Sequence, residues 1–277
     1  MQAHFQRGRF KGQPIDVRTR RSIAIVAEDQ DTLTVDHFFH RGQFHRAVIP
    51  RNAVKRIHGQ LFNFSSGAWL RNPMLNHAQA RFVLDPAHPI RLYPMDRPPA
   101  EPIATLHDIV YSVEVASPHG VSWDLAYAFG DLVCAHRLLS TEEVLFERVV
   151  LGGYRVRQSA ELRLTPDERN RALESVLRRS HAAGMHQPYY LIDRHLRATN
   201  CTSSILDVLD EILACRYTPM QRLISRMLWR LPLHPRRYLR LRSALPSAAA
   251  MPALNEELAA LAASPGMLRR RAALLGA

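Results

Sequence analysis

The stretch from residue 154 to residue 184 constrains the fold more than any other. Tyr154 to Leu164 alternates apolar and polar side chains over eleven residues, the period of a half-buried strand. Thr165-Pro166-Asp167-Glu168 follows at once with a helix N-cap, a proline at the first position and a capping glutamate. We expect this helix to run to about Ala183 and to stop at Gly184. The chain therefore combines strands and helices within one domain.

Strand patterns dominate the part of the chain before residue 154. Asp108 to Ala116 alternates clearly, with Ile109, Tyr111, Val113 and Val115 on one face. Residues 36 to 60 hold several His and Arg and show no clean period. Further strands are expected at Ser22 to Ala27, Thr32 to Val35, Ala78 to Leu84 and Ile90 to Tyr93.

Helical patterns dominate the part after residue 165. A short earlier helix is expected to open at the capping box Ser140 to Glu143 and to close at Gly152-Gly153. After Thr199 to Ser203 an apolar stripe with helical spacing begins; its members are Ile205, Val208, Leu209, Ile212 and Leu213. This order predicts an α+β domain over residues 22–215, in which an antiparallel sheet packs against helices. A basic N-terminal arm (residues 1–21) and a helical, Arg-rich extension (residues 216–277) flank it.

The chain is strongly basic, with a formal net charge of +12 and a pI of about 10.4. Only Lys11 and Lys55 are lysines, so arginine supplies nearly all of the positive charge. Such a balance favours anionic partners, although arginine is also common in proteins from GC-rich genomes. No apolar run approaches the ~18 residues that cross a bilayer, and no apolar segment of a secretory signal follows the basic start.

Cys201 is the first candidate for chemistry, because it lies where the chain turns into the helix expected from about Thr202. Unpaired backbone N–H groups and the helix dipole favour a thiolate there, and they can stabilise an oxyanion during acyl transfer. Thr202 and Ser203 are suitable capping residues. The alternative interpretation is a buried structural cysteine at a helix start.

His77 is the candidate base, because it lies just before the strand Ala78 to Leu84, where a histidine is well placed to activate a thiol on a helix packed across the sheet. We expect the Cys201 sulfur within hydrogen-bond reach of the His77 ring. The other two cysteines, Cys134 and Cys215, are interpreted as structural. An odd count without a Cys-x-x-Cys pair indicates neither a disulfide framework nor zinc. Asp207, Asp210 and Glu211 have a spacing that could bind a metal, but a solvated helix face explains them better.

Several segments together resemble a known family. They are Tyr-Ala-Phe-Gly-Asp at 127–131, Arg-Leu-Leu-Ser-Thr-Glu-Glu at 137–143, Leu-Arg-Leu-Thr-Pro-Asp-Glu at 162–168, Tyr190, and Asn200-Cys201-Thr202. Upstream, Asn-His-Ala-Gln-Ala-Arg-Phe at 76–82 resembles the histidine segment of the same family, in which a histidine opens a strand that ends in an aromatic residue. The chain thereby resembles the Lnb N-terminal periplasmic domain family over about half of its length.

The resemblance implies a permuted papain-like fold, in which the histidine precedes the cysteine. It also implies that Cys201 is the nucleophile and His77 the general base, with Asn200 and Thr202 supporting the site. The reaction would pass through a Cys thioester and transfer an acyl group from a lipid or lipoprotein, without metal or organic cofactor. The implied location is the cell envelope. The residue that orients His77 is not identified; Asp85 and His88 lie nearby in the sequence but match no motif.

Arg216 to Arg242 is a basic, amphipathic segment with three possible roles. It could be a packed helix with a solvated arginine face, it could contact an anionic membrane, or it could bind nucleic acid, the last being the least favoured. The main alternative to an enzyme is a basic binding module for an anionic surface or nucleic acid on a fold that has lost catalysis. An amidase or peptidase would share the same site.

Overall fold

The computed structural model describes residues 3–63, 76–96, 101–192, 198–213, 218–220 and 254–276. The strands are β1 (Ala24–Glu28), β2 (Thr32–His40), β3 (Gln43–Pro50), β4 (Val54–Asn63), β5 (Asn76–Leu84), β6 (Ile90–Pro94), β7 (Ala104–Leu106), β8 (Asp108–Ala116), β9 (Phe129–Ser140), β10 (Arg157–Glu161) and β11 (Pro188–Tyr190). The helical segments are η2 (Leu125–Tyr127), α1 (Thr141–Val144), η3 (Leu145–Leu151), α2 (Pro166–Ala183), α3 (Cys201–Ile212), α6 (Leu254–Glu257), α7 (Ala259–Ala262) and α8 (Pro265–Leu275).

The described strands form one sheet in the order β10-β4-β5-β8-β9-β2-β3-β6-β7, with β1 on β2 and β11 on β9. All neighbours are antiparallel except β2 and β9, which pair in parallel at Phe39 and Leu139. The expected α+β class is therefore confirmed, but the prediction of an antiparallel sheet is wrong at this pair. The reason is that β2 and β9 are distant in sequence, so no hairpin sets their direction.

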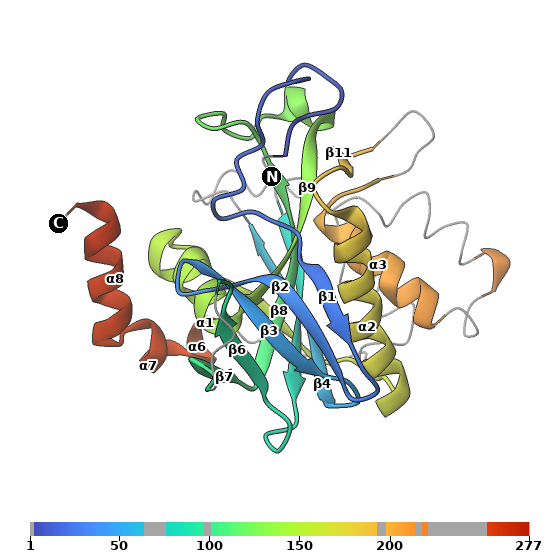
Figure 1. Ribbon diagram of the computed structural model, residues 1–277, viewed down its shortest axis with the longest axis vertical. Helices are drawn as coiled ribbons and strands as arrows, with labels where there is room; N and C mark the ends of the chain where they lie inside the picture. The colour runs from blue at the N-terminus through green and yellow to red at the C-terminus, as the bar shows by residue number, and fades with distance from the viewer. Residues whose placement is uncertain are drawn as a thin grey trace.

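Helices cover the sheet on both faces, as Figure 1 shows. On one face, α2 contacts β1, β4 and β9, and α3 contacts β5 and β8. On the other face, α1 packs on β8, β9 and β2, while α6 packs on β10 and α8 on η3. We call these the α3 face and the α1 face. The main apolar core lies between the sheet and α2 and α3.

Strand β5 contributes differently to the two faces. Ala78, Ala80 and Phe82 alternate with His77, Gln79 and Arg81, because successive side chains of a strand point to opposite sides. Ala80 and Phe82 belong to the core under α3, whereas Arg81 binds Asp108 and Glu257, the latter in α6 on the α1 face. This alternation decides where His77 lies.

Residues 36–60 show no clean period in the sequence but form most of β2, β3 and β4. Two features hide the strand period. In β2 the pairing register shifts between Val35 and Phe38, where His37 has a positive φ of 70°. In β3 and β4, His45 and Gln60 are buried, so polar residues occupy inward positions.

The alternating stretch Tyr154 to Leu164 is a strand only over Arg157–Glu161. Its register on β4 shifts between Gln158 and Glu161, as at a β-bulge. The bulge changes the phase of the alternation: Val156 packs beside Phe62, whereas Leu162 joins the core under α3. The expected single apolar face is therefore divided between the two sides of the sheet.

Both expected helix starts are confirmed, and of the two α2 shows the complete reciprocal capping box. Thr165 caps α2, which ends at Ala183 with Gly184 as its C-cap. Ser140 caps α1, whose helix continues through the π-helical turn η3 to Gly152.

The two ends of the chain also contact the domain. In the N-terminal arm, Phe5, Phe10 and Ile15 are buried in the main core. In the extension, Leu254 and Met267 are buried on the α1 face. Cys215 and nearly all of the segment from Arg216 to Arg242 lie outside the described residues. No helix among the described residues is long and apolar enough to span a membrane.

Candidate functional site

Cys201 is the first residue of α3, as expected from the sequence. The cap is Asn200, not Thr202 or Ser203: its side-chain oxygen accepts hydrogen bonds from the N–H groups of Thr202 and Ser203, both at 2.9 Å. Ser203 returns the contact by accepting from the N–H of Asn200 at 2.9 Å. This reciprocal box fixes the start of the helix and with it the position of the Cys201 side chain.

The Cys201 sulfur lies against the backbone of β5, directly beside His77. It is 4.0 Å from the carbonyl oxygen of Asn76, and the N–H of Ala78 also contacts it. These two backbone groups flank His77. Pairing between β5 and β8 ends at Gln79 and Ser112, so the sulfur occupies the edge of β5 just beyond the last pair.

The thiol of Cys201 is protonated at neutral pH in this arrangement. Burial raises its pKa above the ordinary value, and contacts from the N–H of Ala78 and from Thr202 offset this only in part. Thr202 places its hydroxyl oxygen 3.9 Å from the sulfur. The side chain is 8% exposed, so entry of a reagent requires local movement.

The His77 ring lies on the α1 face of the sheet, opposite to α3. Its Nε2 is 2.8 Å from the Ser112 hydroxyl, and its ring packs 4.9 Å from that of Phe62. The expected hydrogen bond between His77 and Cys201 is not present among the described contacts. Strand alternation is the reason, because His77 and its neighbour Ala78, which faces α3, must point in opposite directions.

Ser112 and Glu114 orient the His77 ring. The Ser112 hydroxyl donates its proton to Glu114 at 3.2 Å, so it accepts one from Nε2 of His77. Nδ1 is then the unprotonated nitrogen, which is the one that can act as a base. Burial lowers the pKa of His77 to about 3, with Arg148 adding to the effect, so the ring is neutral at pH 7.

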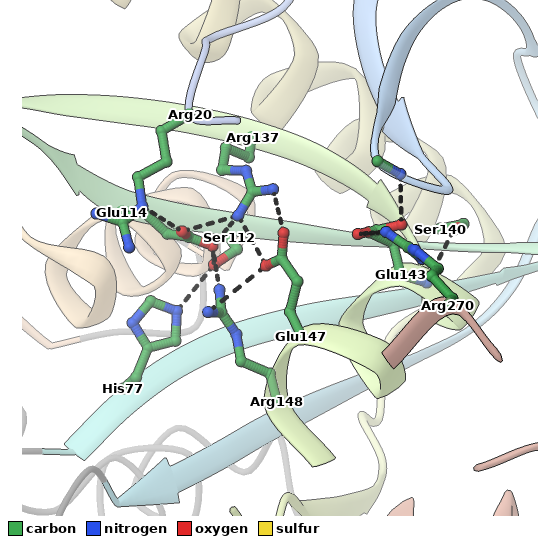
Figure 2. Close-up of polar contacts among 11 residues, drawn as sticks. Arg20, His77, Ser112, Glu114, Arg137, Ser140, Glu143, Glu147, Arg148 and Arg270 are labelled. Carbon is green, nitrogen blue, oxygen red and sulfur yellow. Dashed lines mark hydrogen bonds and ion pairs between the residues drawn. The ribbon is translucent and has the colours of Figure 1, made fainter. Parts of the chain in front are cut away.

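A buried ion cluster surrounds this pair, as Figure 2 shows. Arg137 bonds Glu114 at 2.8 Å and Glu147 at 2.8 Å, and Arg148 also contacts Glu114. Burial alone would raise the pKa of Glu114, but Arg137, Arg148 and Arg20 hold it well below its usual range. Glu114 therefore remains a carboxylate and a strong acceptor for Ser112.

An apolar cavity of about 60 Å³ lies beside the start of α3. Small residues of the sheet, Gly59, Ala78 and Ala80, leave room on one side. On the other side, Thr202 and Ile205 of α3 line the cavity together with Leu206, Val208 and Leu209. Because Thr202 and Ala78 both line the cavity and contact Cys201, the sulfur lies next to one end of it.

Three of the other candidates take part in the core or in ion pairs. Cys134 is buried in the core, as expected. Glu211 bonds Arg179 at 2.9 Å, and the described residues contain no group of His, Cys, Asp and Glu that could bind a metal ion. Asp85 pairs with Lys55 at 2.8 Å, at the end of β5 away from His77.

Sequence reasoning missed Ser112 and Glu114. The signal was present, because the alternation of Asp108 to Ala116 places both on the polar side of a strand. That strand had not been paired with the one carrying His77. No family model matches this chain, and neither a curated protein nor a solved structure matches it.

Proposed function

We propose that the chain is a thiol-dependent acyltransferase or hydrolase of the permuted papain-like kind, with Cys201 as nucleophile and His77 as base. One observation carries the proposal: the thiol lies at a capped helix start, beside the strand that bears His77 and next to an apolar cavity. The resemblance to the Lnb N-terminal periplasmic domain family supports the same assignment.

In the proposed cycle, substrate binding moves the start of β5 at Asn76 and His77, because rotation of the side chain alone cannot carry the His77 ring across the sheet from Ser112 to Cys201. Nδ1 takes the thiol proton, and the thiolate attacks the carbonyl carbon of an acyl ester or amide. The backbone N–H groups of Cys201 and Ala78, which already contact the sulfur, are placed to stabilise the oxyanion. The bond to the leaving group breaks, and the leaving group takes the proton from the imidazolium.

The second half of the cycle releases the acyl group. A thioester on Cys201 passes its acyl group to an amine or to water, whose proton goes first to Nδ1 of His77 and then to the sulfur. No metal or organic cofactor enters these steps. Ser112 and Glu114 act as positioning residues, because they set the tautomer that makes Nδ1 basic.

The apolar cavity favours an acyl chain as the part of the substrate that enters, although at about 60 Å³ it must widen, by movement of α3, to admit more than a few carbons. Its lining is almost wholly hydrocarbon, and a charged or sugar-like group would lose its hydrogen bonds with water there. A lipid or lipoprotein of the cell envelope is the substrate class that this favours, with an anionic membrane as a surface partner. The contact proposed for Arg216 to Arg242 lies outside the described residues.

A second candidate is a basic binding module without catalysis. The raised pKa of Cys201 and the bond between His77 and Ser112 favour it, because neither group is activated as the structure stands. On this reading the cavity binds an apolar group without forming a covalent bond.

Release of p-nitrophenol from p-nitrophenyl octanoate and acetate separates the two functions. A thiol enzyme should release it faster from octanoate, and Cys201→Ser and His77→Ala should each abolish the protein-dependent rate. Ile205→Trp, which narrows the cavity, should slow octanoate more than acetate. Cys134→Ala and His88→Ala serve as matched controls and should keep the rate. Equal rates in wild type and Cys201→Ser would leave the binding module as the better account.

A further inference from the structure

Among the described residues, one side of helix α8 holds it to the domain. Met267 is buried against Leu145 and Phe146. The Arg270 guanidinium lies 3.7 Å from the centroid of the Phe146 ring. It bonds Glu143 at 2.6 Å (Figure 2). Glu143 is itself almost fully buried, so this ion pair fixes how α8 is rotated about its axis.

The side of α8 turned away from these contacts is apolar and exposed. Leu268 and Leu275 are 50% and 65% exposed, and with Ala272 they follow the i, i+4, i+7 spacing of one helical stripe. Leu274, seven residues after Met267, lies outside this stripe near the end of the helix and is 62% exposed. Figure 1 places α8 at the edge of the molecule, on the side opposite to α2 and α3. Neighbouring on the helix surface, Leu268, Ala272 and Leu275 form a contiguous apolar stripe, and such a stripe favours an interaction surface.

The charges around this stripe identify its partner. Residues 258–277 contain three arginines and no aspartate or glutamate. Arg270 is neutralised by Glu143, whereas Arg269 and Arg271 are exposed beside the leucines. Pairing of the stripe with that of a second copy would bring these arginines together without an acidic partner. An anionic lipid surface instead offers phosphates for the arginines and hydrocarbon for the leucines.

We propose that α8 is an interfacial helix, which inserts Leu268 and Leu275 into an anionic lipid surface while Arg269 and Arg271 bind lipid phosphates. Because Arg270 and Met267 set the rotation of α8, the stripe faces outward before the membrane is met. The inference rests on α8 alone and holds whether or not Cys201 is catalytic.

Co-sedimentation of the full chain with vesicles tests this proposal. Wild type should bind vesicles of phosphatidylglycerol and phosphatidylcholine, and bind pure phosphatidylcholine far less. Leu268→Glu/Leu275→Glu should weaken binding about tenfold or more, since both insertion and charge attraction are lost. Val26→Glu/Ile103→Glu is the matched control. It makes the same charge change at two apolar positions that are 47% and 53% exposed outside α8, and it should bind nearly as wild type does.

Circular dichroism confirms that each variant is folded before it is compared. Equal binding by wild type and the α8 variant would overturn the proposal, even if another basic segment of the chain binds lipid. Equal loss in the control variant would also overturn it, because net charge alone would then explain the effect. A wild-type dimer that the α8 variant makes monomeric, without change in vesicle binding, would assign the stripe to a second copy of the chain.

Discussion

The two faces of the sheet differ in the side chains that the same strands present: one face is apolar and the other is polar and charged. Under α3 the strands present small and apolar residues, such as Ala80 and Phe82 of β5, and leave a cavity beside Cys201. On the α1 face the same strands bury His77, Ser112, Glu114 and Arg137, which satisfy one another through hydrogen bonds and ion pairs (Figure 2). The apolar face contains a cavity, whereas on the polar face the buried side chains bond one another.

The proposed nucleophile and the proposed base therefore lie in different environments, one apolar and one polar. Cys201 reaches the edge of β5 from the apolar side, and His77 leaves the same strand towards the polar side. Substitutions in the buried ion cluster of the polar face should therefore lower the free energy of unfolding strongly. They should alter the reactivity of Cys201 only through the position of His77. Changes on the apolar face should affect the cavity directly.

Acid should produce the largest loss of stability. Burial lowers the pKa values of His77 to about 3 and of His40 and His136 to about 4, so the unfolded chain binds protons first as the pH falls. The stability that these neutral rings confer is complete above about pH 6.5 and is lost as the pH falls towards about 3 to 4. At about 1.4 kcal/mol per pKa unit, the loss should reach several kcal/mol by about pH 4.

Urea unfolding at several pH values measures this effect. His77→Gln should flatten the dependence on pH, whereas His88→Gln, at an exposed position, should leave the slope unchanged. Stability that stays constant from about pH 7 to pH 4 would show that the rings titrate normally.

Breaking the buried ion cluster should lower the free energy of unfolding nearly as much as acid does. Arg137→Met removes one of the two arginines that Glu114 and Glu147 share, and Arg148 remains beside both. Removing one partner of a buried ion pair costs about 3 to 5 kcal/mol, and we expect the lower end of that range here. Arg178→Met removes a half-exposed pair with Glu174 and should cost under about 1 kcal/mol. Comparable urea midpoints for the two variants would mean that the cluster is solvated.

On the apolar face, enlarging the cavity should lower the free energy of unfolding somewhat less than Arg137→Met does. Leu209→Ala removes a buried side chain that already lines the cavity, so we expect a loss of about 2 to 4 kcal/mol. Measured by thermal and urea unfolding, this loss should be smaller in the presence of a fatty acid that fills the space. A loss that fatty acid does not change would argue against ligand entry.

The smallest effect should come from the helix caps. Asn200→Ala removes the cap of α3 and Thr165→Ala that of α2, each costing about 1 kcal/mol in urea unfolding. Only Asn200→Ala should also change the alkylation rate of Cys201, because only that cap fixes the start of α3. Equal alkylation rates in both variants would show that the Asn200 cap does not control the reactivity of Cys201.

The sequence predicted the elements whose signals are local. The capping residues Ser140 and Thr165 marked α1 and α2 correctly, and the alternation of Asp108 to Ala116 marked β8. Cys201 was placed at a helix start because Thr199 to Ser203 precedes a helical apolar stripe. Each signal is contained within a few residues of the chain.

Signals that depend on distant partners were not predictable. The β2–β9 pair and the bulge in β10 arise from pairing across the sheet, which one strand does not encode. The orientation of His77 depends on Ser112, which is 35 residues away. The buried His45 and Gln60 concealed strands, because their polarity is satisfied only by tertiary contacts.

The most direct test of the central claim is intact-mass analysis of the protein after brief exposure to p-nitrophenyl octanoate at neutral pH. We predict one octanoyl adduct on Cys201 that hydroxylamine removes, as expected for a thioester. It should be absent in Cys201→Ser and form far more slowly in His77→Ala. Wild type that gains no adduct, or that gains it as fast when His77 is alanine, would contradict the proposed pairing of Cys201 with His77.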